Sequence, residues 1–175
     1  MRKSIILILF LFLSSDMFCQ HIVQNKFFGY FFGLDKEIIK SGFNRDDIYF
    51  SEEQSSLNLY EQKFGGYSWR FVELEFYDDK FYSIYFSTPY KRKSDASELY
   101  NTLKNKLENK YKSINQYENN EEYSNGKIFY DDYNSCIITI NYSESKGGDM
   151  YWYVSINYWN NSLNDERIKS NTNEL

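Results

Sequence analysis

An alternation of apolar and polar residues between Cys136 and Tyr158 is the clearest pattern in the sequence. A period of two residues is typical of a β-strand that buries one face. The even-numbered positions carry the core side chains, namely Cys136, Ile138, Ile140, Tyr142, Met150, Trp152, Val154, Ile156 and Tyr158. The connection from Ser143 to Asp149 is rich in glycine, so we predict a β-hairpin in which Tyr142 lies opposite Met150 and Ile140 opposite Trp152.

The odd-numbered face of this hairpin is rich in aromatic and amide side chains. The residues that we assign to a candidate binding face are Tyr151, Tyr153, Trp159, Asn141 and Asn157 of the hairpin, and Trp69 and Phe71 of an earlier strand. Large aromatic side chains carry much of the binding energy at protein interfaces. This face is therefore the main functional indication in the sequence.

Alternation also predicts strands at Leu57 to Lys63 and Ser68 to Tyr77, with a glycine pair between them. The next strand carries Ile84 on the apolar face. A three-residue loop from Asp78 to Lys80 places Phe76 opposite Tyr82 and keeps the apolar faces together. A two-residue turn would mix the faces unless the second strand held a bulge, and that alternative stays open.

Two segments have the spacing and end signals of helices. The first covers 34–42, with Asp35 as N-cap, Gly42 just past its end, and Ile38 and Ile39 on its buried side. The second begins near Asp95, which pairs with Glu98 in the manner of a capping box. Its apolar stripe consists of Ala96, Leu99, Leu103, Leu107 and Tyr111.

These elements predict an α+β fold with an antiparallel sheet of about six strands and two helices on one face. The order helix, strand, strand, strand occurs twice, which suggests a tandem repeat of 27–87 and 95–159 within a single domain, 20–159. A divider at 88–94 contains Pro89 and the cations Lys91, Arg92 and Lys93. The polar segment 160–175 is expected to be a flexible tail without regular structure.

Residues 1–19 have the pattern of a signal peptide, with two cations before an apolar run that is too short to span a bilayer. We place the cut after Cys19, with a cut after Ser15 as an alternative. A lipoprotein signal would acylate Cys19, but Asp16 and Phe18 stand where that signal needs leucine and a small residue. The expectation is an exported chain, periplasmic or secreted, with no membrane span after cleavage.

The stretch from Phe32 to Ile39 resembles the glycine-then-helix opening of the β-lactamase-inhibitor-like and SmpA/OmlA-like envelope domains. The order of one helix and three strands is similar over 27–87 and more faintly over 95–158. The segment from Ser41 to Asn44 lacks the Gly-x-Pro that usually follows the helix. The resemblance implies a protein-binding scaffold without catalysis, and it carries over no site residues.

Composition removes several function classes. The net charge of −5 argues against a nucleic-acid partner. His21 is the one histidine of the chain, which excludes self-contained Ser-His-Asp, Cys-His and histidine-ligated zinc sites. No phosphate-binding or dinucleotide motif is present, so no cofactor is expected. Aromatic residues make up 21% of the chain, which favours strands over helices.

Carboxylates and the remaining thiol have structural interpretations. Glu73 and Glu75 supply candidates for paired-carboxylate hydrolysis, but their spacing is that of the solvent side of a strand. The run 131–134 offers oxygen ligands without the regular acidic alternation of a calcium loop, so no metal is expected. Cys136 is in line with apolar neighbours, which predicts a buried thiol that packs as a small hydrophobe.

The function that fits these observations is an exported, non-enzymatic binding module with a protein partner. One alternative is a carbohydrate-binding module, in which the same rings stack on sugars while Asn141 and Asn157 supply hydrogen bonds. Another is a hydrolase with paired carboxylates. In a purely structural interpretation, the aromatic face is covered by Phe27 to Phe32 and by the loop from Asn44 to Ser56.

Overall fold

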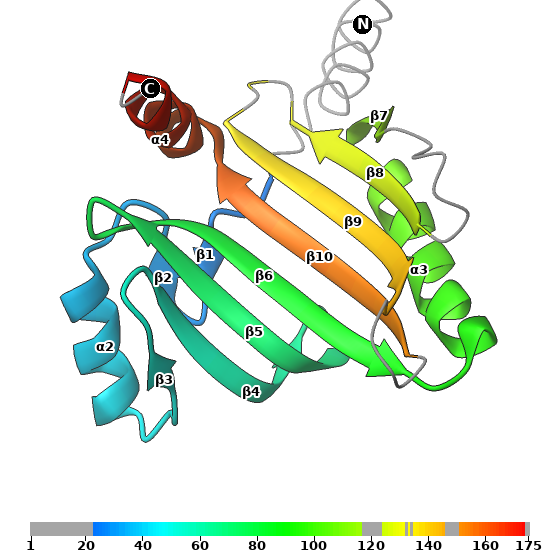
Figure 1. Cartoon of the computed structure of the whole chain (residues 1–175), viewed down its shortest axis with the longest axis horizontal. Coiled ribbons are helices and arrows are strands. Elements are labelled where there is room, and N and C mark those ends of the chain that lie inside the picture. Colours follow the sequence, from blue (N-terminus) through cyan, green and yellow to red (C-terminus); the bar gives the residue numbers. More distant parts are fainter. Residues whose placement is uncertain (1–22, 117–123, 132, 134, 146–150, 174–175) are drawn as a thin grey trace, which may run out of the picture.

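The computed structural model describes residues 23–116, 124–131, 133, 135–145 and 151–173. Eight strands form one antiparallel sheet in the order β3-β4-β5-β6-β10-β9-β8-β7 (Figure 1). Their bounds are β3 Ser51–Glu52, β4 Ser56–Phe64, β5 Tyr67–Tyr77, β6 Lys80–Tyr90, β7 Lys112–Gln116, β8 Ser124–Tyr130, β9 Cys136–Glu144 and β10 Trp152–Asn160. The α+β prediction is confirmed, with a larger sheet than expected. The predicted signal peptide lies outside the described residues.

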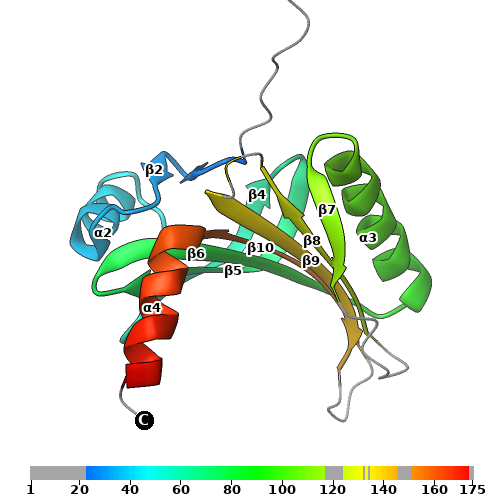
Figure 2. The same ribbon diagram turned by 90° about the horizontal axis from the view of Figure 1, so that it is seen from above.

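Helices and a small hairpin cover one side of the sheet. Helices α2 (Lys36–Arg45) and α3 (Lys93–Glu108) lie there, together with the hairpin of β1 (Lys26–Phe27) and β2 (Tyr30–Phe31). Figure 2 shows that the last helix, α4 (Asn161–Asn173), projects from the opposite side. Within the described ranges, no helix is long and apolar enough to cross a membrane. We call the side that bears α4 the open face.

The two halves of the chain meet at the centre of the sheet, where β6 pairs with β10. Strands β4, β5 and β6 lie on one side of this contact, and β10, β9 and β8 on the other. The strand order is therefore symmetric about the β6–β10 pair (Figure 1).

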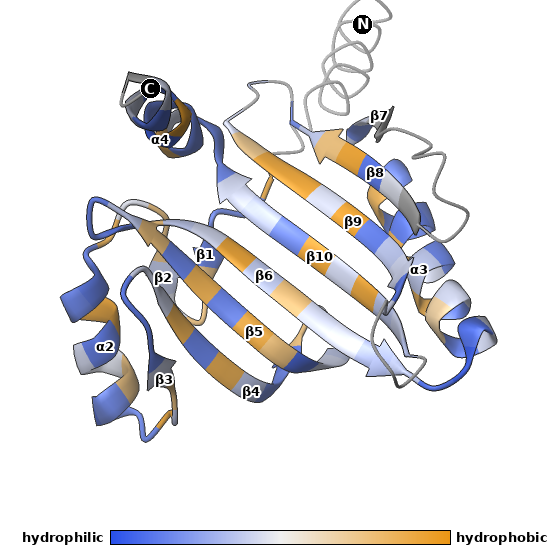
Figure 3. Cartoon of the chain, in the orientation of Figure 1, coloured by the Kyte–Doolittle hydropathy of each residue, from blue (hydrophilic) through white to orange (hydrophobic). Residues whose placement is uncertain are grey.

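The alternation of apolar and polar residues along the strands is visible in Figure 3. On β9 and β10 the even-numbered side chains from Cys136 to Tyr142 and from Trp152 to Tyr158 are buried, as predicted. The predicted pairing is wrong by four residues, because Tyr142 lies opposite Val154 and Ile140 opposite Ile156. A shift by an even number of residues keeps every side chain on its face, so the hydrophobic pattern cannot distinguish the two registers.

The turn between β5 and β6 contains two residues, not the predicted three. Asp78 and Asp79 have φ angles of 47° and 57°, a left-handed conformation that aspartate tolerates. Phe76 consequently lies opposite Phe81, and a bulge next to Glu75 restores the apolar face. The bulge alternative is correct. Tyr82 leaves the core side and faces α4, where the guanidinium of Arg167 lies 5.5 Å from its ring.

Helix α2 begins after Asp35, as predicted, but continues through Gly42 to Arg45. Ile39 is fully buried, whereas Ile38 is 51% exposed, so the prediction for Ile38 is wrong. Gly42 is needed for packing, since a Cβ at this position would lie 1.7 Å from the Tyr30 hydroxyl. A glycine inside this helix therefore allows β2 to approach it.

Helix α3 confirms the second predicted helix. Its stripe packs into the core, with Leu107 partly buried. The helix begins two residues before the predicted start, and its N-cap is Arg92 without a side-chain cap. Asp95 forms an ion pair with Arg92 at 2.9 Å in place of the expected capping box. A charge of opposite sign satisfies Asp95 locally.

Asp131 ties the beginning of the described chain to the sheet. Its side chain is 3% exposed and accepts hydrogen bonds from the backbone N–H of Val23 at 3.2 Å, and from the N–H groups of Tyr133 at 3.2 Å and Ser135 at 3.1 Å. The Ser135 hydroxyl donates a fourth at 2.9 Å. These donors give the carboxylate a structural role in its loop, while Asp132 and Asn134 lie outside the described residues.

Candidate binding groove on the open face of the sheet

One row of side chains crosses the open face in register: Tyr60, Phe71, Ser87, Ser155 and Asn141. The two serines are 4% and 6% exposed and form a floor of small polar groups. Tyr60 and Phe71 remain 47% and 40% exposed, and their rings contact edge to face at 5.8 Å. An exposed aromatic pair thus stands beside a flat, small-residue surface.

The segments that were expected to cover this face lie on the other one. The Phe27 ring packs in the core, 4.9 Å from the ring of Tyr158. In the following loop, Phe50 packs against Phe43, also on the core side. The structural interpretation, in which these segments bury the aromatic face, is therefore wrong.

A kink in the hairpin of β4 and β5 reverses the faces of the two strands. Glu61 has a φ angle of 53°, which interrupts the pleat of β4. Beyond this point Trp69 points into the core, is 1% exposed, and donates its indole N–H to the carbonyl of Phe64 at 3.1 Å. The prediction that Trp69 projects from the open face is wrong. Phe71, on the other side of the kink, does project from it.

The same region separates β5 from β6. The ladder between them ends at the pair Phe71 and Ser87, whereas β6 continues along β10 as far as the pair Tyr90 and Trp152. Pro89 lies in this last part of β6, where it is paired with Tyr153 of β10 and has no partner on the side towards β5, so that part of β6 resembles an edge strand, which tolerates proline. The divider between the halves therefore begins after Tyr90, later than predicted.

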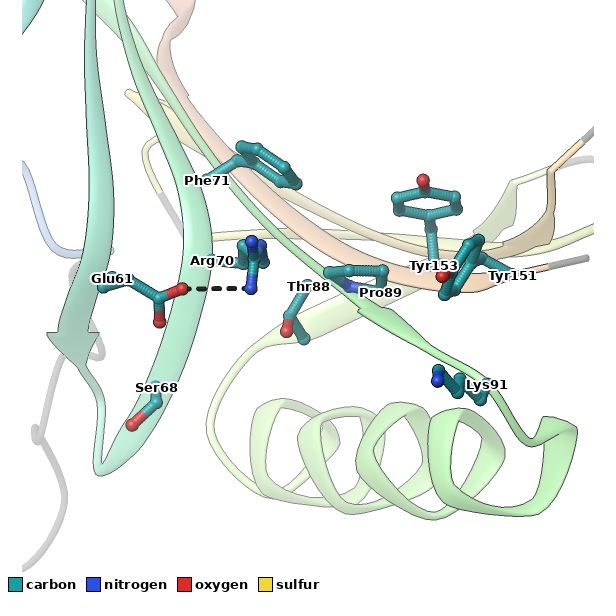
Figure 4. A pocket seen from close by; sticks show the side chains of 9 residues that line it. All are labelled: Glu61, Ser68, Arg70, Phe71, Thr88, Pro89, Lys91, Tyr151 and Tyr153. Atoms are coloured by element: carbon teal, nitrogen blue, oxygen red, sulfur yellow. Dashed lines mark ion pairs between the residues drawn. The ribbon is translucent and has the colours of Figure 1, made fainter. Parts of the chain in front are cut away.

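A groove of about 520 Å³ opens where the two strands separate. Its lining residues are Glu61, Ser68, Arg70, Phe71, Thr88, Pro89, Lys91, Tyr151 and Tyr153. Figure 4 shows Phe71 and Tyr153 on opposite sides, with Arg70 next to Phe71 and Pro89 between the two rings. Three of the seven predicted binding residues, Phe71, Tyr151 and Tyr153, meet in this groove, and they come from β5 and from the start of β10.

The groove carries two cations and one carboxylate. Arg70 forms an ion pair with Glu61 at 3.3 Å, and both side chains are well exposed. Lys91 belongs to the basic run after β6, whose other members are engaged elsewhere. Arg92 pairs with Asp95, and the ammonium of Lys93 lies 4.7 Å from the centre of the Trp152 ring. Of this run, Lys91 alone lines the groove.

Trp159 and Asn157 lie at the other end of the open face, under α4. They line a second cavity of about 310 Å³, together with Arg167 of the helix. The indole nitrogen of Trp159 and the Nε of Arg167 are buried without a hydrogen-bond partner among the described residues. Trp159 follows Tyr153 by six residues on β10, which is about 20 Å along an extended strand. The predicted binding face is thus divided into two sites.

Helix α4 replaces the predicted unstructured tail. The Oδ1 of Asn160 accepts the N–H of Leu163 at 3.0 Å and caps the first turn. Arg167 then reaches the ring of Tyr82, and burial raises the pKa of Tyr82 to about 12. The prediction of a segment without regular structure is wrong for Asn161–Asn173, because a cap and an anchoring cation–π contact support a helix that lacks an apolar stripe.

The amides and carboxylates assigned from the sequence are dispersed. Asn157 accepts a hydrogen bond from the Ser83 hydroxyl at 3.0 Å, and Asn141 is not among the residues that line the groove. Glu75 lines the second cavity. Burial raises the pKa of the Glu73 carboxyl, and a hydrogen bond with Ser56 partly opposes this shift. No group of three or more potential metal ligands occurs among the residues that the structure places.

Six lining residues were not predicted from the sequence, among them Arg70, Lys91, Thr88 and Pro89. Arg70 occupies an even position, so simple alternation assigns it to the core side, and only the kink at Glu61 turns it to the groove. The basic run containing Lys91 was a visible signal, but sequence spacing did not separate Lys91 from Arg92 and Lys93. Comparison of the chain with known protein families, curated proteins and solved structures found no match.

Proposed function

We propose that this chain is an exported binding module without catalytic activity, and that the groove between β5 and β6 binds a protein partner. The observation that carries the proposal is the meeting of Phe71, Tyr151 and Tyr153 beside Arg70 at one partly exposed site. Tyrosine and arginine are enriched among the residues that dominate protein interfaces. The resemblance to envelope scaffold domains suggests the same class of function.

The carbohydrate alternative has less support from the geometry. It required Asn141 and Asn157 beside the tyrosine rings, where their amides would bind sugar hydroxyls. Asn157 lies in the second cavity and already accepts a hydrogen bond from Ser83. Beside the rings the groove is lined by a proline, two cations, one carboxylate and two hydroxyl side chains, and neither of the two asparagines is among them.

Affinity capture tests the proposal. Wild-type protein immobilised through a C-terminal tag is incubated with an envelope extract of its own cells, and bound proteins are identified by mass spectrometry. We expect one stoichiometric partner that is lost with the double variant Phe71→Ala/Tyr153→Ala. Truncation of a central interface aromatic typically costs about 2 kcal/mol, which is roughly thirtyfold in affinity.

Tyr49→Ala is the matched control, since Tyr49 is 79% exposed and does not line the groove. This variant should retain the partner. The proposal fails if capture is unchanged in the double variant, or if a glycan array gives binding that depends on Tyr153 while no protein is retained. Turnover on a panel of hydrolase substrates that disappears in Glu75→Gln would show an enzyme instead.

A further inference from the structure

We infer that the partner enters the groove as an extended peptide segment that places a carboxylate beside an apolar side chain. This inference rests on the proposed function and specifies the chemistry of the partner. Three features of the groove carry it: the sign of its charge, the size and lining of its cavity, and the strand edges that form its walls.

The charge of the groove is opposite to that of the chain. The protein has a net charge of −5, yet its groove presents Arg70 and Lys91 against the single carboxylate of Glu61. Lys91 forms no ion pair with another described residue. Arg70 pairs with Glu61 where the two side chains are 60% and 68% exposed, and such a pair is weak and easily exchanged. A carboxylate of the partner can replace Glu61 on Arg70, and Lys91 offers a second cation on the Tyr151 side of the groove (Figure 4).

The cavity fits a short segment and excludes a large domain. A volume of about 520 Å³ is in the range of sites that enclose one compact ligand or a few side chains. The ring of Phe71 forms an apolar surface on the side of Arg70, and the rings of Pro89 and Tyr153 form another on the side of Lys91 (Figure 4). An apolar side chain of the partner packs on one of these surfaces while its neighbouring carboxylate pairs with the cation beside it.

The walls of the groove are the edges of β5 and β6 beyond the point where the two strands stop pairing. The ladder between β5 and β6 stops at Phe71 and Ser87, so the edge of β5 at Ser68–Arg70 has no partner on the side of β6, while Pro89 leaves the facing edge of β6 with a carbonyl but no N–H at that position. Backbone N–H and C=O groups of such edges bind an added extended chain, as in peptide recognition by sheet edges. A sugar lacks the regular backbone donors and acceptors that match a strand edge, which is why the geometry favours a peptide.

Peptide display tests the inference directly. A library of random dodecapeptides is selected on the wild-type protein, with counter-selection on Phe71→Ala/Tyr153→Ala to remove peptides that bind elsewhere. We expect the selected peptides to be enriched in Asp or Glu next to a large apolar residue. For synthetic copies, Arg70→Gln/Lys91→Gln should lower the affinity about tenfold, because hydrogen bonds to charged groups contribute to this order.

The control is Lys110→Gln/Lys169→Gln, which removes the same charge from two exposed positions that do not line the groove. This variant should bind the peptides as the wild type does. The inference is overturned if the selected peptides are neutral or basic, if no peptide depends on the groove, or if Arg70→Gln/Lys91→Gln binds normally. Groove-dependent binding of polygalacturonate without peptide binding would also overturn it.

These outcomes are distinct from a failure of the proposed function. If capture of the protein requires Phe71 and Tyr153 but not Arg70 and Lys91, the groove is still a protein-binding site. The inference of an acidic segment in the partner then fails. If neither Phe71→Ala/Tyr153→Ala nor Arg70→Gln/Lys91→Gln loses the captured protein, both the proposed function and this inference fail.

Discussion

Replacement of Asp131 tests whether this buried carboxylate acts as a structural anchor. In Asp131→Asn one oxygen becomes an NH₂ group, which cannot accept a hydrogen bond. Oδ1 accepts the N–H groups of Tyr133 and Ser135, so we expect the amide oxygen to keep this position. The NH₂ group then faces the N–H of Val23, which is 1% exposed and loses its acceptor.

The expected cost follows from these donors. One buried N–H without a partner costs about 1–3 kcal/mol, and the Ser135 hydroxyl can rotate to accept from the new NH₂ group, so Asp131→Asn should lower the free energy of unfolding by about 2 kcal/mol. Asp131→Ala also removes the acceptor for Tyr133 and Ser135. Since these N–H groups lie in an exposed loop and can bind water, each adds only about 0.5–1.5 kcal/mol, for a total of about 3–5 kcal/mol.

Urea unfolding followed by tryptophan fluorescence measures these changes, and hydrogen exchange of the Val23 amide localises them. Asp47→Asn is the control, because Asp47 is exposed with a φ angle of 52° that asparagine also adopts, and its change should stay within about 0.5 kcal/mol. The reasoning is refuted if Asp131→Asn is as stable as the wild type. A rise in the wild-type midpoint on addition of calcium would instead support a metal loop.

Three further predictions concern packing, the buried thiol and acid stability. Gly42→Ala should displace Tyr30 and bring no gain in stability, whereas in a Tyr30→Ala background it should stabilise α2 by about 1 kcal/mol, as thermal unfolding of the four proteins would show. Burial raises the pKa of Cys136 to about 11. In a Cys19→Ser background, iodoacetamide at mildly alkaline pH should therefore modify Cys136 in the unfolded chain but not in the native one. Rapid modification of the native chain would contradict the burial of this thiol. Hydrogen bonds from lysines, chiefly Lys40, lower the pKa of Glu52. The contribution of Glu52 to stability is therefore present above the ordinary glutamate pKa and is lost as pH falls through the lowered value. The free energies of unfolding of the wild type and Glu52→Gln should consequently converge in acid.

The faces of the strands could be predicted from the sequence wherever the pleat is regular. Along β9 and β10 the alternation identified the buried side chains, including Trp152 and Val154. Their register could not be predicted, because the observed shift of four residues, like any even shift, preserves both faces. Local exceptions were also invisible. The kink at Glu61 turns Trp69 inwards and Arg70 towards the groove, and the bulge beside Glu75 reverses a neighbouring position.

The candidate site was predicted in part for the same reason. Tyr151, Tyr153 and Phe71 were identified because each lies where the alternation of faces still holds, Phe71 on the regular side of the kink. Trp159 was placed on the correct face, but α4 covers its end of the sheet. The helical pattern of 161–173 is weak in the sequence, since this helix has no apolar stripe and depends on contacts with β5 and β10.

Hydrogen exchange of the chain with and without its captured partner tests the central claim, that the groove between β5 and β6 is the binding surface. The account predicts that protection increases at Ser68–Arg70, at Thr88–Tyr90 and at Tyr151–Tyr153, and stays unchanged on α2 and α3. Protection confined to the two helices, with no change along these strand edges, would contradict it.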